Sequence, residues 1–248
     1  AVETEAGGDT WRSVDEIPEG AEVTAVAVAP TADGPILLGL DGRLLRSDDG
    51  GHRWEEVDVA GDDPVRAIEF SPDFDGDGTV FVGTEGGGVS RSVDGGRSFD
   101  RSEGQPDDDR VSSIHVSDGY ADDGTVWAST WDAGPYRSDD RGASWELVDE
   151  GVTTDEMADD LGRPHFLEID AFGAPGEDGH LLVVDGFDGL FLSEDPGSTW
   201  TESDTQDPTN IVSIGLSPDY ARDRTVFVAT YVNGLHRATD GGATWTPH

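Results

Sequence analysis

The chain has 248 residues and no cysteine, and 54 acidic residues against 15 basic ones give it a formal net charge of −39. This charge repels phosphate backbones and anionic lipid surfaces, which disfavours nucleic-acid and membrane-surface roles. The absence of cysteine excludes disulfides, thiolate nucleophiles and zinc–thiolate sites. The sequence also has no apolar run of about 18 residues that would predict a transmembrane segment.

The acidic residues are spread through the whole chain, among apolar strand patterns, and are not gathered in one tail. This distribution is typical of a protein in concentrated salt, where ions screen the self-repulsion. We therefore expect a halophilic protein, extracellular or on the cell surface, with a cytoplasmic location left open. The chain begins at Ala1 without a methionine or an apolar signal segment, so we expect either a removed leader or a fragment of a longer protein.

A motif of the form Ser-x-Asp-x-Gly-x-x-Trp recurs along the chain, and we call it the repeat motif. Its Ser and Asp accept hydrogen bonds from nearby backbone N–H groups, its Gly supplies a strained backbone angle, and its aromatic residue begins the next strand. The aromatic residues of the six copies, the first of which is degenerate, are Trp11, Trp54, Phe99, Trp145, Trp200 and Trp245. Their spacing, mostly in the forties, is the length of one four-stranded propeller blade.

Each repeat contains short alternating apolar runs divided by Gly, Asp or Pro turns, a pattern that predicts β-hairpins. The chain therefore predicts an all-β fold, a single β-propeller of four-stranded antiparallel blades. We expect five blades, with part of a six- or seven-bladed ring as the alternative. The predicted divisions are an N-terminal closing strand within 1–22, blade 1 at 23–64, blade 2 at 65–110, blade 3 at 111–148, an acidic insertion at 149–164, blade 4 at 165–210 and blade 5 at 211–248.

The N-terminal copy of the repeat motif is followed by a strand at Trp11–Asp15 that belongs to no complete blade. We expect this strand to lie beside Thr244–His248 and to close the ring, because closure removes exposed sheet edges.

A second repeated feature is a turn of the Ser-Pro-Asp-Tyr type after the first strand of a blade, at Ser71–Phe81, Ser117–Trp127 and Ser217–Phe227. With this turn and the repeat motif, the chain resembles the Asp-box (BNR-repeat) β-propellers over nearly its whole length. That family includes sialidases, xyloglucanases, sortilin-type receptors and photosystem II assembly factors, so the resemblance implies an architecture and not an activity. It also implies that the motifs lie on the face away from the binding site.

The arginines fall into two groups. Those in one column just before the repeat motif are expected to be scaffold, and they are Arg46, Arg91, Arg137 and Arg237. Arg66, Arg110 and Arg163 fall at or just before the starts of successive first strands, where they would bind an anion or form local salt bridges. The Arg-Ile-Pro sequence typical of sialidases is absent, which disfavours that activity.

Alignment of the first strands brings charged residues into columns that otherwise hold small residues. Glu69, His115 and Asp170 share one column with Ala27 and Gly215, and Glu168 lies in a neighbouring column. Near a propeller axis these four would perform acid–base chemistry or bind a metal, or they would form a self-satisfied network in a wet channel. They are the candidate catalytic residues.

The turn between the second and third strands carries Glu85, Trp131, Phe187 and Tyr231 in blades two to five. Aromatic side chains there would stack on a sugar or anchor a protein partner, or each would cover the edge of its own blade.

Asp73, Asp75 and Asp77 resemble the start of a calcium loop, but the twelfth position is Thr84 and not an acid. We therefore expect no cofactor, with calcium at these three residues as the alternative.

The favoured hypothesis is a non-catalytic propeller, a monomer or part of a larger assembly, that holds a protein or glycan on the face opposite the repeat motifs. The alternative is a glycoside hydrolase that uses two of Glu69, Glu168 and Asp170.

The charge predicts that removal of salt loosens the fold, because carboxylate repulsion is then unscreened. Circular dichroism and thermal melting from molar to millimolar KCl measure this directly. We expect a steep fall in melting temperature and strand signal, and an unchanged spectrum and melting point would refute the halophilic interpretation.

Overall fold

The computed structural model describes residues 2–3, 12–13, 17, 20–59, 62–102, 110–131, 133–152, 166–171, 181–185, 189–203, 211–217 and 219–248. Within these ranges the strands form five four-stranded antiparallel sheets and one two-stranded sheet. Each four-stranded sheet is made of four strands that are consecutive in the chain, so the sheets are simple meanders.

We number the four-stranded sheets in chain order. The first contains β3 (Val23–Val28), β4 (Ile36–Leu40), β5 (Arg43–Ser47) and β6 (Glu55–Val57). The second contains β7 (Val65–Phe70), β8 (Val80–Thr84), β9 (Gly88–Ser92) and β10 (Asp100–Arg101). The third contains β11 (Val111–Val116), β12 (Val126–Thr130), β13 (Gly134–Ser138) and β14 (Glu146–Leu147).

The fourth sheet contains β15 (Phe166–Ala171), β16 (Leu181–Asp185), β17 (Leu190–Ser193) and β18 (Thr201–Glu202). The fifth contains β19 (Ile211–Leu216), β20 (Val226–Thr230), β21 (Gly234–Ala238) and β22 (Thr246–Pro247). Three single helical turns connect first and second strands, at α1 (Phe74–Asp77), α2 (Tyr120–Asp123) and α3 (Tyr220–Asp223).

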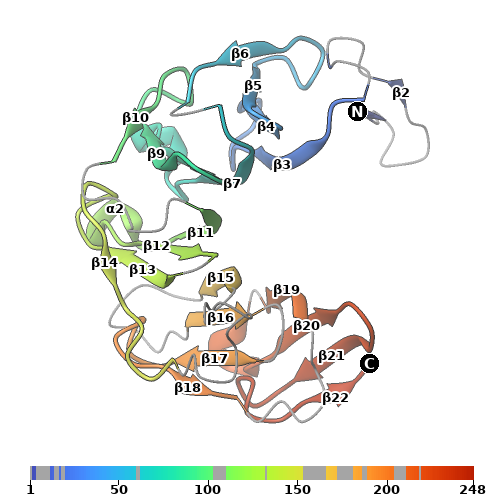
Figure 1. Ribbon diagram of the computed structural model, residues 1–248, viewed down its shortest axis with the longest axis vertical. Coiled ribbons are helices and arrows are strands. Elements are labelled where there is room, and N and C mark those ends of the chain that lie inside the picture. Colours follow the sequence, from blue (N-terminus) through green and yellow to red (C-terminus); the bar gives the residue numbers. More distant parts are fainter. Residues whose placement is uncertain are drawn as a thin grey trace.

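The five sheets follow one another along a crescent, with each first strand on the inner side and each fourth strand on the outer side (Figure 1). First strands of neighbouring sheets also lie next to one another. This radial arrangement is that of a β-propeller, and it confirms the predicted all-β fold with four-stranded antiparallel blades.

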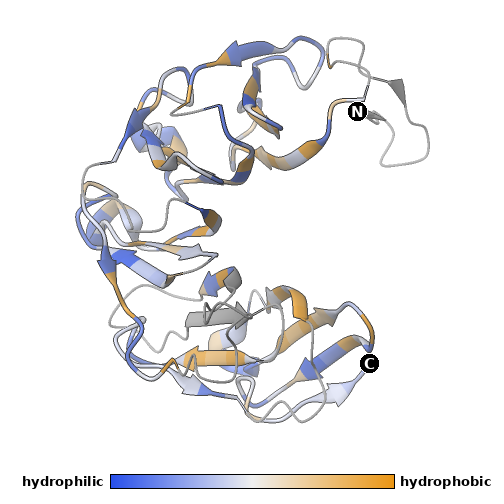
Figure 2. Ribbon diagram, in the orientation of Figure 1, coloured by the Kyte–Doolittle hydropathy of each residue, from blue (hydrophilic) through white to orange (hydrophobic). Residues whose placement is uncertain are grey.

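The hydrophobic core lies between the sheets. Leu37 and Leu44 of the first sheet pack against Val65, Ile68 and Phe70 of the second, and all five are buried. Figure 2 shows apolar residues on the inner strands of the crescent. Each side chain of this size contributes about 1.5–3 kcal/mol when it is buried, so the contacts between sheets hold the crescent together.

The repeat motif closes the turn between third and fourth strands. In the third sheet, Ser138 Oγ accepts a hydrogen bond from the Gly142 N–H at 2.8 Å, and Asp140 Oδ1 accepts one from the Ser144 N–H at 2.8 Å. Gly142 has φ +81°, and a Cβ there would lie 2.5 Å from Phe81 of the second sheet. The glycine is therefore required by both the turn and the neighbouring sheet.

The two short strands on either side of the N-terminal copy of the motif pair with each other. β1 (Val2–Glu3) pairs with β2 (Arg12–Ser13), with Glu3 opposite Arg12. This is the same nine-residue register as Arg137 opposite Glu146 in the third sheet.

The observed pairing differs from the predicted closure of the ring. Arg12 and Ser13 pair with β1, and β22 pairs with β21 alone among the described strands. A local hairpin brings its strands together at a smaller entropic cost than pairing the two ends of the chain. The termini accordingly lie on opposite sides of an opening (Figure 1). The predicted acidic insertion at 149–164 lies mostly outside the described residues.

Asp140→Ala removes a carboxylate that accepts hydrogen bonds from Ser138 Oγ, the Ser144 N–H and Ser144 Oγ. We expect the free energy of unfolding to fall by about 1–3 kcal/mol, measured by thermal melting in molar KCl. Asp100→Ala, at an exposed position on β10, is the matched control. Equal melting temperatures for the two variants would contradict the structural role of the motif.

Candidate functional site

The sheets have two ends, which define two faces of the crescent. The turn after the first strand and the turn with the repeat motif lie at the same end, since the Arg141 N–H donates to the Gly124 carbonyl at 2.9 Å. Because the strands are antiparallel, the turn between second and third strands lies at the other end. We call these ends the motif face and the opposite face.

A pocket of about 420 Å³ lies on the opposite face between the second and third sheets. We call it the opposite-face pocket, and its lining residues are Arg66, Glu85, Arg110, Val111, Ser112 and Trp131. It has an apolar wall from Trp131 and Val111 and a charged wall from the second sheet.

Strand register explains why these side chains meet. Arg66 lies at the start of β7 and Glu85 directly follows β8, its antiparallel partner. Arg66 donates two hydrogen bonds to Glu85 Oε2, from Nε at 3.1 Å and from Nη2 at 2.6 Å. In the third sheet the Trp131 N–H donates to the Arg110 carbonyl at 2.8 Å. Both strand starts are thus fixed to the turns that follow the second strands.

Four of the seven predicted binding residues therefore converge on one pocket: Arg66, Glu85, Arg110 and Trp131. Tyr231 occupies the equivalent turn of the fifth sheet, with 84% of its surface exposed. Phe187 and Arg163 lie outside the described residues.

A second cavity, of about 450 Å³, lies along the inner side of the crescent, and we call it the axial cavity. Residues from the first strands of all five sheets line it, among them Glu69, His115, Glu168 and Asp170. The structure thus brings together the four candidate catalytic residues. Arg66 and Ser112 line both the axial cavity and the opposite-face pocket, so the two are adjacent.

The side chains of the axial cavity are engaged with one another. His115 Nδ1 lies 3.2 Å from Asp170 Oδ1, which also accepts a hydrogen bond from the Ala171 N–H at 2.9 Å. Glu168 Oε2 accepts a hydrogen bond from the Ile214 N–H of the fifth sheet at 2.7 Å. These contacts link the third, fourth and fifth sheets around the axis.

Burial changes the acidity of two carboxyls in this cavity. Desolvation, together with the charge of Asp170, raises the pKa of Glu69 to about 7, although His115 acts in the opposite direction. Desolvation also raises the pKa of Glu168, against the hydrogen bond from Ile214. Glu69 is therefore a carboxyl that exchanges a proton near neutral pH, beside a histidine and a second carboxylate.

One of the three predicted calcium residues, Asp77, holds the turn together through its side chain. Asp77 accepts hydrogen bonds from Ser71 Oγ and the Thr79 N–H, both at 2.7 Å. Asp123 and Asp223 make the same contacts in their own turns. Among the described residues, no group of three or more His, Asp or Glu is arranged to hold a metal ion.

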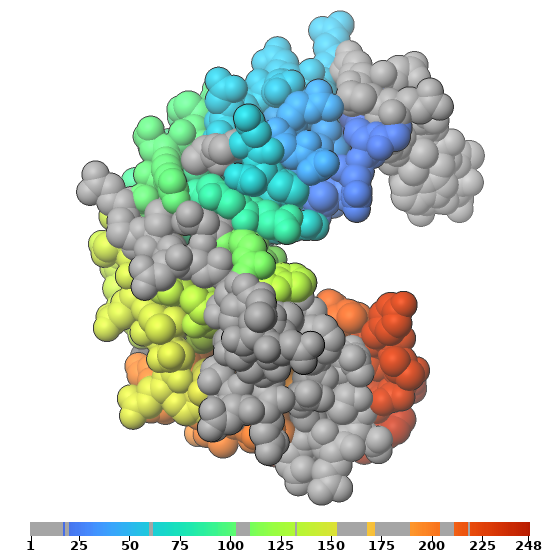
Figure 3. Space-filling view, in the orientation of Figure 1, coloured from blue at the N-terminus to red at the C-terminus, as the bar shows by residue number. Residues whose placement is uncertain are grey.

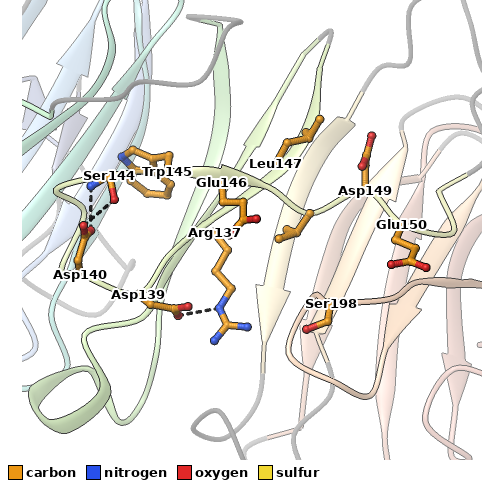
Figure 4. Close-up of a pocket in the computed structure, with 11 residues that line it drawn as sticks. Arg137, Asp139, Asp140, Ser144, Trp145, Glu146, Leu147, Asp149, Glu150 and Ser198 are labelled. Atoms are coloured by element: carbon orange, nitrogen blue, oxygen red, sulfur yellow. Dashed lines mark hydrogen bonds and ion pairs between the residues drawn. The ribbon is translucent and has the colours of Figure 1, made fainter.

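A larger pocket, of about 590 Å³, lies on the motif face between the third and fourth sheets (Figure 4). Its polar residues already have structural roles, because Asp140 closes the repeat motif and Arg137 Nη1 donates to the Pro196 carbonyl of the fourth sheet at 3.2 Å. Arg137 also pairs with Asp139, with 2.7 Å between Nε and Oδ1. This pocket is a joint between sheets, and we do not take it as the candidate site.

Comparisons with known proteins agree with the fold. No protein-family model matches the chain, and no curated protein sequence matches it. Many solved structures are similar. One is the GH74 xyloglucanase from Xanthomonas campestris, with a TM-score of 0.64 and 18% identity over 91% of this chain and 38% of that one.

Two further similar structures are YCF48 bound to D1 peptide and the extracellular domain of the hybrid two-component system BT4673 from B. thetaiotaomicron. YCF48 gives a TM-score of 0.60 and 15% identity over 90% of this chain and 70% of that one. BT4673 gives a TM-score of 0.67 and 14% identity over 91% of this chain and 30% of that one. This chain thus spans about a third of the xyloglucanase and BT4673 chains, and these identities establish the propeller fold alone.

Sequence reasoning placed Arg66 and Glu85 in separate groups and missed their contact, and it did not single out Ser112 or Val111. Arg66 lies at the register shift between Val65 and Ala67, so its contact with Glu85 depends on a strand irregularity that the sequence alone does not indicate.

Glu69→Gln tests the axial cavity by pH. Because the folded-state pKa lies above the ordinary 4.5, the contribution of Glu69 is fully present below about pH 4.5 and is lost as the pH rises through about 7. We expect the variant to be more stable than the parent at pH 8 by about 3 kcal/mol, with a flatter stability profile between these limits. Urea unfolding in molar KCl measures this.

Glu146→Gln is the matched control, since it makes the same chemical change at an exposed position on β14. A Glu69→Gln profile parallel to those of the parent and the control would show that this carboxyl has an ordinary pKa.

Proposed function

We propose that the chain is a non-catalytic binding propeller whose opposite-face pocket holds a segment of a partner protein. The observation that carries the proposal is the convergence of Arg66, Glu85, Arg110 and Trp131 on that pocket. The structure of YCF48 bound to D1 peptide supports it, since a propeller of similar fold holds a peptide.

The chemistry of the pocket suits a peptide. Trp131, with 37% of its surface exposed, provides a rigid aromatic anchor beside Val111. Arg66 and Glu85 are each about half exposed, so their ion pair contributes little to stability. The pair can therefore exchange its partners for the amide or charged groups of a bound segment at small cost.

A glycoside hydrolase is the second candidate function. It is supported by Glu69, whose pKa of about 7 is suitable for a general acid, and by the similarity to GH74 xyloglucanases. We favour binding because the possible partner carboxylates are engaged: Asp170 with His115 and Glu168 with the Ile214 N–H.

The proposal extends to family and location. We infer a member of the Asp-box propellers, because the repeat motif makes the same hydrogen bonds in successive sheets. We infer an extracellular or cell-surface protein of a halophile from the charge of −39 and from the extracellular BT4673 domains of similar fold. The described residues contain no helix long and apolar enough to cross a membrane.

Trp131→Ala is expected to weaken peptide binding by roughly tenfold or more, because aromatic anchors contribute about 2 kcal/mol or more at such sites. The measurement is binding of the purified chain to an immobilised random-peptide array in molar KCl, beside an array of xyloglucan oligosaccharides. Leu147→Ala, which removes an exposed apolar side chain on the motif-face side, is the matched control.

Peptide binding that is equal in Trp131→Ala and the control would reject the pocket. Cleavage of the oligosaccharides by the parent, lost in Glu69→Gln, would establish the hydrolase in its place.

A further inference from the structure

The two ends of the crescent expose the residues that neighbouring sheets cover elsewhere in the molecule. Val26 of the first sheet is 64% exposed. The equivalent residues of sheets two to five are at most 8% exposed, and they are Ile68, Ile114, Ile169 and Ile214. These isoleucines pack toward the preceding sheet, as Ile169 does against Trp127. Val26 is exposed because no complete four-stranded sheet precedes the first among the described residues.

The fifth sheet shows the complementary feature on its other side. Leu235 is 40% exposed, whereas the equivalent Leu44, Val89 and Leu190 are fully buried. Leu44 is buried by Val65 and Ile68 of the following sheet. Leu235 therefore belongs to a column that a following sheet covers, and the described residues contain no such sheet.

Figure 3 shows the opening between the surfaces of the first and fifth sheets. One side of the opening carries Val26, from the surface that normally packs on a preceding sheet. The other side carries Leu235, from the surface that normally packs on a following sheet. Exposed apolar faces of this kind mark sites of association.

The N-terminal hairpin is the outer half of such a sheet. β1 and β2 pair in the register of third and fourth strands, and β1 pairs with no other described strand. In every four-stranded sheet the third strand also pairs with a second strand. The hairpin thus lacks the two inner strands of a four-stranded sheet, which would join it at β1. Figure 1 places this hairpin beside the first sheet at the opening.

We propose that the opening accepts one and a half further repeats of the same type. A complete four-stranded sheet packs on the fifth sheet, and a following pair of inner strands joins β1 and β2 to make the sheet that precedes the first. With repeats of about 45 residues, this addition would bring the chain to about the length of the YCF48 chain, of which the match covers 70%. A second copy of the crescent fits poorly, because its five sheets form a longer arc than the opening (Figure 1).

The chain contains no cysteine, so single introduced thiols report on each face. In the parent, Val26→Cys and Leu235→Cys are expected to react readily with a maleimide in molar KCl. Ile114→Cys is the buried control. Light scattering is expected to give the mass of a monomer. Slow labelling of both surface thiols together with a dimer mass would overturn the proposal in favour of a second copy.

The decisive variant carries a duplicate of residues 58–130 after His248. It supplies a complete sheet equivalent to β7–β10 and an inner pair equivalent to β11–β12. The duplicated Val65 would face Ala229 of the fifth sheet, which is equivalent to Gly39 of the first sheet. A Cβ on Gly39 would lie 2.7 Å from Val65. The duplicate therefore carries Val65→Ala to make room for the Ala229 side chain. We expect thiols at positions 26 and 235 to react about tenfold more slowly than in the parent, and the melting temperature to rise.

The matched control is an extension of the same length with Ile68→Asp and Phe70→Asp in the duplicate, because these charges cannot be buried against the fifth sheet. It is expected to label like the parent. Equal labelling rates at both thiols in the two extended chains would overturn the proposal. This outcome is independent of peptide binding at Trp131, so failure here and failure of the proposed function are separate results.

Discussion

The structure depends on close packing of each sheet against the next. Gly39 and Gly83 lie so near Val65 and Val111 of the following sheets that a Cβ on either glycine would lie less than 3 Å from the valine. At these positions the close approach leaves no room for a larger side chain, so side-chain volume is the main constraint on the sequence there. It also fixes where the first strands lie, and hence the shape of both the axial cavity and the opposite-face pocket.

The same packing accounts for the charges at the centre. Where the first strands approach the axis, Ala25 and Ala67 contribute small side chains, and β7, β11 and β15 contribute polar ones. Glu69, His115 and Asp170 are therefore drawn into one electrostatic unit by the geometry of the sheets. Their partial burial raises the pKa of Glu69, and the engagement of His115 with Asp170 limits the chemistry open to them. The opposite-face pocket, in contrast, combines an exposed aromatic residue with a surface ion pair.

Much of the fold could be predicted from sequence because the repeat motif is local. Ser138, Asp140 and Gly142 satisfy one another within a single turn, so their spacing is sufficient to predict the hairpin, and five four-stranded sheets follow from its recurrence. The alignment of first strands likewise placed Glu69 beside His115 and Asp170. The strand with which Arg12–Ser13 pairs was not predictable in this way, because a short strand carries no signal that selects its partner. The contact of Arg66 with Glu85 needed the register of β7 with β8.

The open arrangement has a consequence for cooperativity. Each described four-stranded sheet contacts its neighbours in the chain, and the first and fifth sheets each have one side that no other described four-stranded sheet covers. Such a molecule behaves as a linear array in which stability is the sum of sheet terms and nearest-neighbour terms. The interior sheets are protected on two sides and the terminal sheets on one, so amide exchange is expected to be fastest at the ends of the array. The third sheet, which carries Trp131 and His115, lies at its centre, where the backbone is held most rigidly.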